Sequence, residues 1–116
     1  MRIKRDFLDD IFSECIRKRD KGICQRCGKD VGLTPGLHCS HYIKRRYKAT
    51  RWDEDNCCAL CFGCHQYFEE NRDEYTQFMI YRLGELGFDL LNSRKRITYP
   101  KPDRKLIELY LREKLN

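Results

Sequence analysis

Apolar residues recur every three or four positions near the start of the chain, in RDFLDDIFSECIRKRDKG. This spacing places them on one face of an amphipathic helix, because an α-helix completes a turn in about 3.6 residues. The pattern stops before Gly22, which favours a helix end there. We therefore predict an N-terminal packing helix. Its apolar face comprises Phe7, Leu8, Ile11, Phe12, Cys15 and Ile16.

Two short stretches have the composition of β-strands: LHCSHYI at 37–43 and CCAL at 57–60. Residues 29–36, between the first helix and these strands, hold two glycines and a proline and are typical of a loop. The strands are separated by the basic stretch KRRYKATRWDEDN, which ends in turn-forming residues. The sequence therefore predicts a hairpin with a long basic loop.

The second half of the chain has mainly helical spacing. The pattern runs through residues 64–91, with interruptions expected at Asn71 and at residues 84–87. A basic, proline-containing connection, SRKRITYPKP, follows. The segment DRKLIELYLREKLN then predicts a last helix that begins near Asp103 or the proline before it.

Length and composition favour one small α+β domain. A chain of 116 residues with 41% apolar residues supports a modest core. We expect a single domain over residues 1–116. Its parts are an N-terminal helix at 1–22, a core at 23–71 that holds seven of the eight cysteines, and a C-terminal helical arm at 72–116.

Charge and hydropathy bear on compartment and partners. No apolar run approaches the roughly 20 residues of a membrane span, and the first residues are charged throughout. We therefore expect a cytoplasmic protein with no membrane partner. The formal net charge of +6 is consistent with a polyanionic partner.

The spacing of the eight cysteines points to a metal site. In a reducing compartment, paired Cys-x-x-Cys motifs are better interpreted as metal ligands or redox centres than as disulfides. Cys24 and Cys27 form one such pair, and Cys61 and Cys64 form another. Four cysteines complete a tetrahedron and leave no open position, so we predict a structural Zn²⁺ site.

A second pairing is possible, because Cys58 and Cys61 have the same spacing. We favour 61 with 64, because Gly63 relieves the turn between them, whereas the residues after Cys58 continue a strand. The remaining cysteines are interpreted as small packing residues. These are Cys15, Cys39, Cys57 and Cys58.

The residues between the two cysteine pairs include a His…Asn…His series: His41, Asn56 and His65. With CQRCG, SHY, RWDEDN, CFGC and the downstream EEN…EY…RLG, the chain resembles the HNH, or ββα-metal, nucleases. It is most similar to the phage NinG (Rap) recombination endonucleases, and in its knuckles and paired histidines also to phage endonuclease VII. The resemblance implies a zinc-stapled ββα-metal finger with flanking helices.

The three residues have separate expected roles. His41 aligns with the first histidine of the family and is the candidate general base, because neutral imidazole can take a proton from water. His65 is the candidate ligand for a catalytic divalent cation. Asn56 is expected to hold the basic loop through side-chain to backbone hydrogen bonds and so to orient His41.

Three positions depart from the family pattern, and one of them is His65, where NinG proteins frequently have asparagine. HNH nucleases commonly have aspartate directly before the base histidine, where this chain has Ser40, and NinG proteins tend to have aspartate at the position of His38. Because alternate strand residues share a face, His38 and Ser40 are both candidate ligands. The expected cation is Mg²⁺ or Mn²⁺, and an imidazole-rich site also favours Ni²⁺ or Co²⁺.

The basic loop is a candidate phosphate clamp, because a cluster of cations beside a phosphate-cleaving centre gives salt-sensitive, sequence-independent affinity. Its candidate DNA-binding residues are Lys44, Arg45, Arg46, Lys48 and Arg51.

The sequence favours a phage or prophage HNH endonuclease that nicks or cleaves double-stranded DNA, including the branched DNA that the NinG resemblance implies. Cleavage of both strands would require a homodimer. One alternative is a non-catalytic zinc module that binds nucleic acid. Another is a rubredoxin-like electron carrier, which would contain iron.

Overall fold

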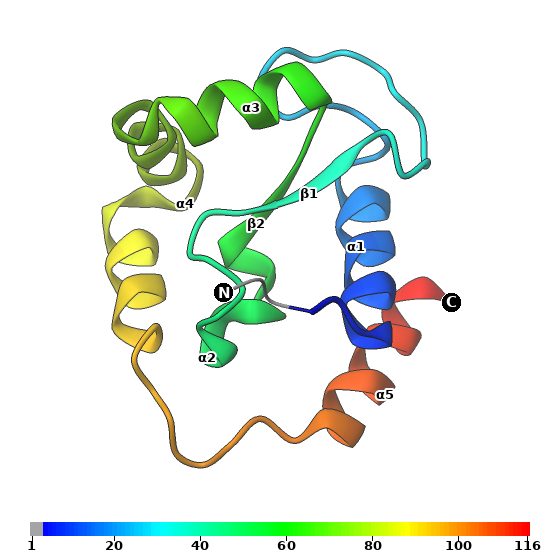
Figure 1. The fold of residues 1–116 in the computed structure, drawn as a ribbon, viewed down its shortest axis with the longest axis vertical. Coiled ribbons are helices and arrows are strands. Elements are labelled where there is room, and N and C mark those ends of the chain that lie inside the picture. Colours follow the sequence, from blue (N-terminus) through cyan, green and yellow to red (C-terminus); the bar gives the residue numbers. More distant parts are fainter. Residues whose placement is uncertain (1–3) are drawn as a thin grey trace.

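The predicted hairpin lies at the centre of an α+β fold (Figure 1). The computed structural model describes residues 4–116, so positions 1–3 of the predicted 1–22 segment lie outside the described residues. Strand β1, His38–His41, pairs antiparallel with β2, Cys57–Leu60. The predicted strand extends to residue 43, but β1 ends at His41. The amide of Ile43 donates to the Asn56 side chain and not to a neighbouring strand.

Helix α1, Phe7–Arg19, begins at a capping box. The Asp6 carboxylate accepts from the Leu8 amide, and the Asp9 carboxylate accepts from the Asp6 amide, both at 2.9 Å. These bonds satisfy backbone donors that a helix start leaves free. The predicted apolar face is buried, except Phe7, which is 51% exposed.

The chain leaves α1 through Gly22, whose φ is +75°. A Cβ there would meet the Gly32 backbone at 3.0 Å, and the Gly22 carbonyl accepts from the amides of Val31 and Gly32. Glycine is therefore required on both counts, since a side chain would be strained and would clash. This close approach folds the loop that carries the first cysteine pair back against the helix end.

The segment between the strands is more ordered than the predicted loop. It contains the one-turn helix α2, Lys48–Arg51, and the 3₁₀ turn η1, Glu54–Asn56. Asp53 caps η1 by accepting from the Asp55 amide at 3.0 Å. The turn-forming residues at the end of the basic stretch therefore build a defined turn that leads directly into β2.

Three further helices follow β2. Helix α3, Phe62–Glu70, ends at Asn71, and α4, Arg72–Arg94, has a kink at Gly84, where φ is 77° and ψ is 161°. Both interruptions lie where the sequence predicts them. Helix α5, Arg104–Leu115, begins at Asp103, whose carboxylate accepts from the Leu106 amide.

The helices surround the hairpin (Figure 1). Helix α3 crosses one end of the two strands, α1 and α4 lie on opposite sides of them, and α5 packs against α1. Tyr75 and Met79 of α4 are completely buried, so these side chains belong to the core. None of the helices in residues 4–116 combines the length and apolar character that a membrane crossing needs.

Candidate metal and active site

The four cysteines of the two predicted knuckles come together. The sulfur atoms of Cys24, Cys27, Cys61 and Cys64 all lie within 4.8 Å of one another, and those of Cys27 and Cys61 are 3.9 Å apart. Four sulfurs at such separations fit a tetrahedral site with Zn–S bonds of about 2.3 Å. This tetrad could hold a zinc ion, and it joins a loop before the hairpin to the start of α3.

The tetrad contains thiols of unequal acidity. Burial opposes ionisation of Cys24, but hydrogen bonds from the amides of Cys27, Cys61 and Arg26 bring the pKa of its thiol down to about 6. Burial and the neighbouring cysteine side chains raise the pKa of Cys64 to about 12. A bound cation would replace the protons that crowded thiols retain, which is the usual coupling of metal binding to proton release.

The geometry groups Cys61 with Cys64 and leaves Cys58 out, in line with the predicted pairing. Cys58 is fully buried within β2 and is not part of the tetrad. Cys15 and Cys57 are also buried, as expected of packing residues. Cys39 is different, because it is partly exposed and lines a cavity.

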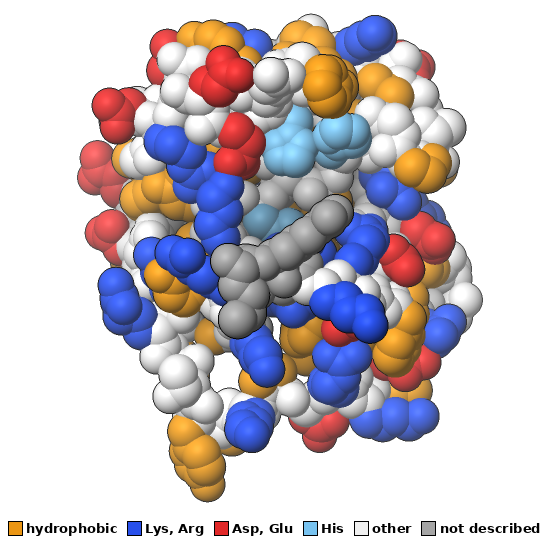
Figure 2. All heavy atoms as spheres, viewed as in Figure 1, with side chains coloured by type: hydrophobic (Ala, Val, Ile, Leu, Met, Phe, Trp, Pro, Cys, Tyr) orange, Lys and Arg blue, Asp and Glu red, His pale blue; other side chains and the backbone are white. Residues whose placement is uncertain are grey.

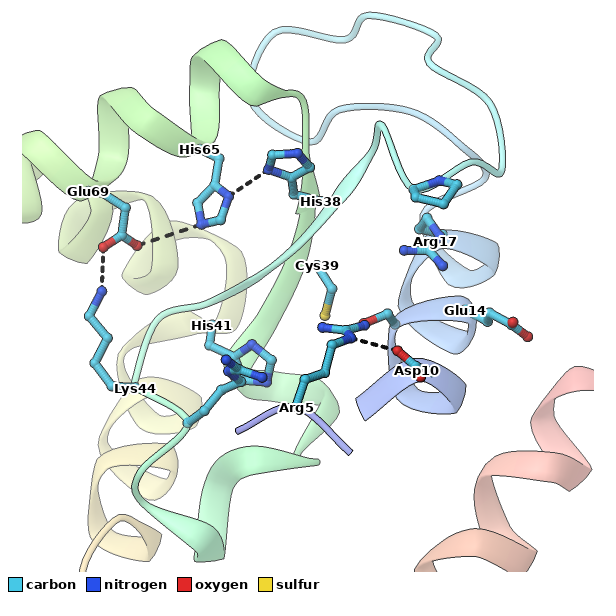
Figure 3. A pocket seen from close by; sticks show the side chains of 13 residues that line it. Arg5, Asp10, Glu14, Arg17, His38, Cys39, His41, Lys44, His65 and Glu69 are labelled. Carbon is cyan, nitrogen blue, oxygen red and sulfur yellow. Dashed lines mark hydrogen bonds and ion pairs between the residues drawn. The ribbon is translucent and has the colours of Figure 1, made fainter. Parts of the chain in front are cut away.

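This cavity, of about 900 Å³, lies between α1, β1 and α3. All three histidines of the chain line it (Figure 3). His41 and His65 therefore share one cleft. The remaining lining residues are mostly charged, so the cavity is a polar one.

His38 and His65 form the upper part of this cavity (Figure 3). Their Nδ1 atoms are 2.9 Å apart, and the Nε2 atom of His65 lies 3.8 Å from a carboxylate oxygen of Glu69. Burial and the neighbouring His38 ring lower the pKa of His65. His65 is therefore neutral at pH 7, the state in which imidazole binds a metal.

His41 lies lower in the cavity, beside the ring of Phe12 at a centroid distance of 5.8 Å. Its Nε2 atom is 2.8 Å from the carbonyl oxygen of Arg51, an acceptor, so Nε2 carries the proton. The Nδ1 atom then keeps its lone pair. Burial lowers the pKa of His41 to about 4, and the charge of Arg45 acts in the same direction.

Asn56 is completely buried and bonded to the basic loop through both ends of its amide. Its Oδ1 atom accepts from the Ile43 amide at 2.7 Å, and its Nδ2 atom donates to the carbonyls of Ile43 and Thr50 at 2.9 and 3.1 Å. Thr50 directly precedes Arg51, whose carbonyl accepts from His41. These contacts connect Asn56 to His41 through the loop backbone.

The structure does not bring Ser40 to the histidines. Its side chain is completely buried, and its hydroxyl is hydrogen-bonded to that of Tyr75 at 2.6 Å. Ser40 faces the α4 side of the hairpin, whereas Cys39 and His41 line the cavity. The expected pairing of His38 and Ser40 as ligands on one face therefore does not occur in this geometry.

The five candidate DNA-binding residues fall into three environments. Lys44 forms an ion pair with Glu69 at the cavity rim, and the guanidinium of Arg45 lies 3.6 Å from the Asp9 carboxylate. Arg46 and Lys48 are exposed and line a second hollow of about 610 Å³. Lysine and arginine side chains are numerous on the face that also carries the histidines (Figure 2).

Arg51 is not available at the surface. It is 6% exposed, and its guanidinium donates to both carboxylate oxygens of Asp9, at 2.9 and 2.5 Å. Its role in this geometry is to join α2 to the start of α1, so it is separate from the exposed phosphate-clamp candidates. The sequence alone does not predict the burial of Arg51, because residue type does not distinguish a buried arginine from an exposed one.

Among the cavity residues that the sequence did not assign to a site are Glu69 and Cys39, the latter predicted to be a packing residue. Glu69 follows His65 by four positions on α3, a spacing that places both on one helix face and could have identified it. Cys39 precedes His41 by two positions on β1, so the two share a strand face. The signal in each case is a short local spacing.

Comparisons with known proteins agree on a phage-related nuclease-like family. Residues 3–115 match the family described as the Bacteriophage Lambda NinG protein. The chain is also 28% identical over 85 residues to the Type IV methyl-directed restriction enzyme EcoKMcrA of Escherichia coli (strain K12). That alignment covers 67% of this chain but only 30% of the restriction enzyme. No solved structure matches the chain.

Proposed function

Because this chain belongs to the family of the bacteriophage lambda NinG protein, we propose that it is a metal-dependent DNA endonuclease of the HNH type. The observation that carries this proposal is the single cavity that contains His41 together with the adjoining His38 and His65. The relative from Escherichia coli is a restriction enzyme, which supports DNA as the partner of this chain.

His38 and His65 are the proposed ligands of the catalytic divalent cation, and Glu69 lies beyond His65, beside its other ring nitrogen. Two ligand atoms that are each about 2.1 Å from a metal and subtend a right angle at it lie about 3 Å apart. The Nδ1 atoms of His38 and His65 have this separation, because they are 2.9 Å apart. Mg²⁺ or Mn²⁺ would bind there, and the two imidazoles also suit Ni²⁺ or Co²⁺. When bound, the cation neutralises charge on the phosphate and on the leaving oxygen.

His41 is the proposed general base. Its Nδ1 lone pair can accept a proton from water, and the hydrogen bond from Nε2 to the Arg51 carbonyl fixes the tautomer that this role needs. Asn56 is a positioning residue, because it holds the loop that presents this carbonyl. The base and the cation ligands would then act on one phosphodiester group in the cavity.

The DNA backbone is proposed to run from the cavity across the exposed basic residues. Lys44 and Arg45 lie at the cavity, and Arg46 and Lys48 continue the positive surface into the second hollow. Contacts of this kind bind phosphate without reading bases, so the substrate is double-stranded DNA, including branched DNA, with little sequence preference. A homodimer would be needed to cut both strands, and the proposed compartment is the cytoplasm of a host carrying the phage or prophage.

A plasmid-nicking assay tests the proposal. Zinc-loaded protein with Mg²⁺ or Mn²⁺ is expected to convert supercoiled plasmid to the nicked form. His41→Ala should lower the rate at least about a hundredfold, in line with the loss of an acid–base group. His65→Ala should also lower it strongly, because it removes a ligand of the cation that neutralises charge on the phosphate. Asn92→Ala is a control, because Asn92 is exposed on α4 away from the cavity. Identical rates for wild type and His41→Ala would refute the assignment.

A non-catalytic nucleic-acid-binding module is the second candidate. The observation in its favour is that the lysine and arginine side chains that line the second hollow do not line the cavity of the histidines. It predicts that wild-type protein binds duplex DNA but leaves plasmid uncut with every divalent cation tested. Linear, supercoiled and four-way-junction substrates should be compared in the same experiment.

A further inference from the structure

The inner wall of the cavity carries a second cluster of metal-binding atoms. Cys39 and His41 lie two positions apart on β1, and Cys57 on β2 is the register partner of His41. One ligand atom from each of these three residues lies within 4.8 Å of the other two. In the close-up of the cavity, Cys39 and His41 both project from β1 among the lining residues (Figure 3).

We propose that Cys39, His41 and Cys57 form a second metal site, selective for a soft divalent cation such as Zn²⁺. It is separate from the cysteine tetrad, and it differs from the His38 and His65 pair in having sulfur ligands. Thiolate and imidazole together favour Zn²⁺ over Mg²⁺, which prefers oxygen.

The ligand separations are close to those that zinc requires. Zn–S bonds of about 2.3 Å and Zn–N bonds of about 2.0–2.1 Å place tetrahedral ligands about 3.5–3.8 Å apart. The three ligand atoms lie within 4.8 Å of one another. Side-chain rotations that move each atom by about an ångström bring them to the separations of a tetrahedral site. Three protein ligands leave a fourth position, which water can fill from the cavity.

Burial and charge also suit a zinc ion. Cys57 is completely buried at the back of the cluster, whereas Cys39 and His41 line the cavity and give access to it. Two thiolates cancel the charge of one divalent cation, so the occupied site is neutral, and a neutral group is less costly to bury than a charged one.

The partner of His41 completes a familiar feature of zinc sites. Histidines that bind zinc usually donate their second ring N–H to a carbonyl or carboxylate, which orients the ring. The Nε2 atom of His41 makes such a bond to the Arg51 carbonyl at 2.8 Å. The remaining nitrogen has the lone pair that a metal needs.

Occupancy of this site would switch off the proposed nuclease. A cation at His41 uses the same lone pair that the general base needs, so excess Zn²⁺ should inhibit cleavage that Mg²⁺ supports. This consequence rests on the proposed function, whereas the existence of the site does not. The two parts can therefore fail separately.

Cobalt binding tests the site directly. Reduced full-length protein, with one equivalent of Zn²⁺ bound, is titrated with Co²⁺ while the thiolate-to-cobalt absorption in the near ultraviolet is recorded. We expect this absorption in wild type and its loss in Cys39→Ser and in Cys57→Ser. The His38 and His65 pair cannot produce it, because it contains no sulfur.

Cys15→Ser is the matched control, because Cys15 belongs to neither group of metal-binding atoms. Its buried thiol donates to the Leu111 carbonyl, and serine can keep that bond. It should retain the cobalt absorption. Absence of the absorption in wild type, or equal absorption in folded Cys39→Ser, would overturn the site. The second result would mean that Co²⁺ had displaced Zn²⁺ from the tetrad.

Zinc inhibition tests the switch. Plasmid nicking in Mg²⁺ should fall at least tenfold with a few equivalents of added Zn²⁺ in wild type, and Cys39→Ser should keep its activity. Equal inhibition of both proteins would overturn the switch. If no protein cuts plasmid, the proposed function fails, and the cobalt result still decides the metal site.

Discussion

At the scale of single residues, the protonation of His41 is set by its surroundings. Burial lowers its pKa from 6.5 to about 4, and one ring nitrogen is fixed by the Arg51 carbonyl. The residue type and the family resemblance identify a candidate base. The pKa and the tautomer follow only from what surrounds the ring.

This pKa predicts a pH-dependent stability. Between pH 6.5 and about 4, the unfolded chain binds a proton at His41 that the folded protein does not, so the free energy of unfolding falls as the pH falls through this window. Urea unfolding of wild type at pH 7.5 and 5.5 should show a larger loss than that of His41→Gln. Equal losses in the two proteins would contradict the low pKa.

At the scale of elements, a buried ion pair joins α1 to α2. Asp9 is 2% exposed and Arg51 is 6% exposed, and Asp9 also accepts from the Trp52 indole N–H at 3.1 Å. Burial alone would raise the pKa of Asp9, but the hydrogen bond from Arg51 outweighs it with the help of other contacts, so the pKa is lowered. The pair fixes the backbone that presents a carbonyl to His41.

Arg51→Ala should destabilise the protein by about 3–5 kcal/mol, because it removes from the buried Asp9 carboxylate the guanidinium that donates to both of its oxygens. Arg112→Ala removes a solvent-screened pair with Glu108 on one helix face and should cost far less. The difference in unfolding free energy between the two variants is measured in urea. Similar small losses in both would show that the Asp9 pair contributes little.

At the scale of the whole molecule, the cysteine tetrad connects two segments that are distant in sequence. It ties the loop after α1 to the start of α3, and α3 carries His65 directly after Cys64. A metal in the tetrad would therefore fix the end of the hairpin and one wall of the cavity together.

The tetrad of the purified protein should hold one tightly bound zinc ion, and removal of this ion by a chelator should lower helical circular dichroism and abolish any nicking activity. Cys61→Ser should have the same effect, whereas Cys58→Ser, outside the tetrad, should retain the metal. Elemental analysis decides between zinc and the iron that the rubredoxin-like alternative requires. A chelated protein with an unchanged spectrum would argue against a structural role.

The second hollow belongs to the same scale, because α2 and the connection before α5 build it together. Lys95 and Lys101 line it with Arg46 and Lys48. If both lysines contact phosphates, Lys95→Ala/Lys101→Ala should reduce the slope of log affinity for DNA against log salt by about 1.8. Lys29→Ala/Arg112→Ala, a charge-matched exposed control, should leave the slope unchanged.

Local pattern was sufficient for most elements of the fold. The helix breaks at Asn71 and Gly84, the start of α5 at Asp103 and the two strands all lie near their predicted positions. The turn within the basic loop was missed, because α2 is a single turn with no sequence period to detect. Short elements are stabilised by their neighbours, and local sequence carries little of that information.

The sequence by itself determined the family and the chemical groups: two cysteine pairs, three histidines and a basic segment within one NinG-like chain. Tertiary structure decided which of these groups meet. It buried Arg51 and Ser40, paired His38 with His65, and placed Cys39 and Cys57 around His41. The reason is physical: residue type fixes what a side chain can bind, whereas packing fixes its neighbours, its exposure and its pKa.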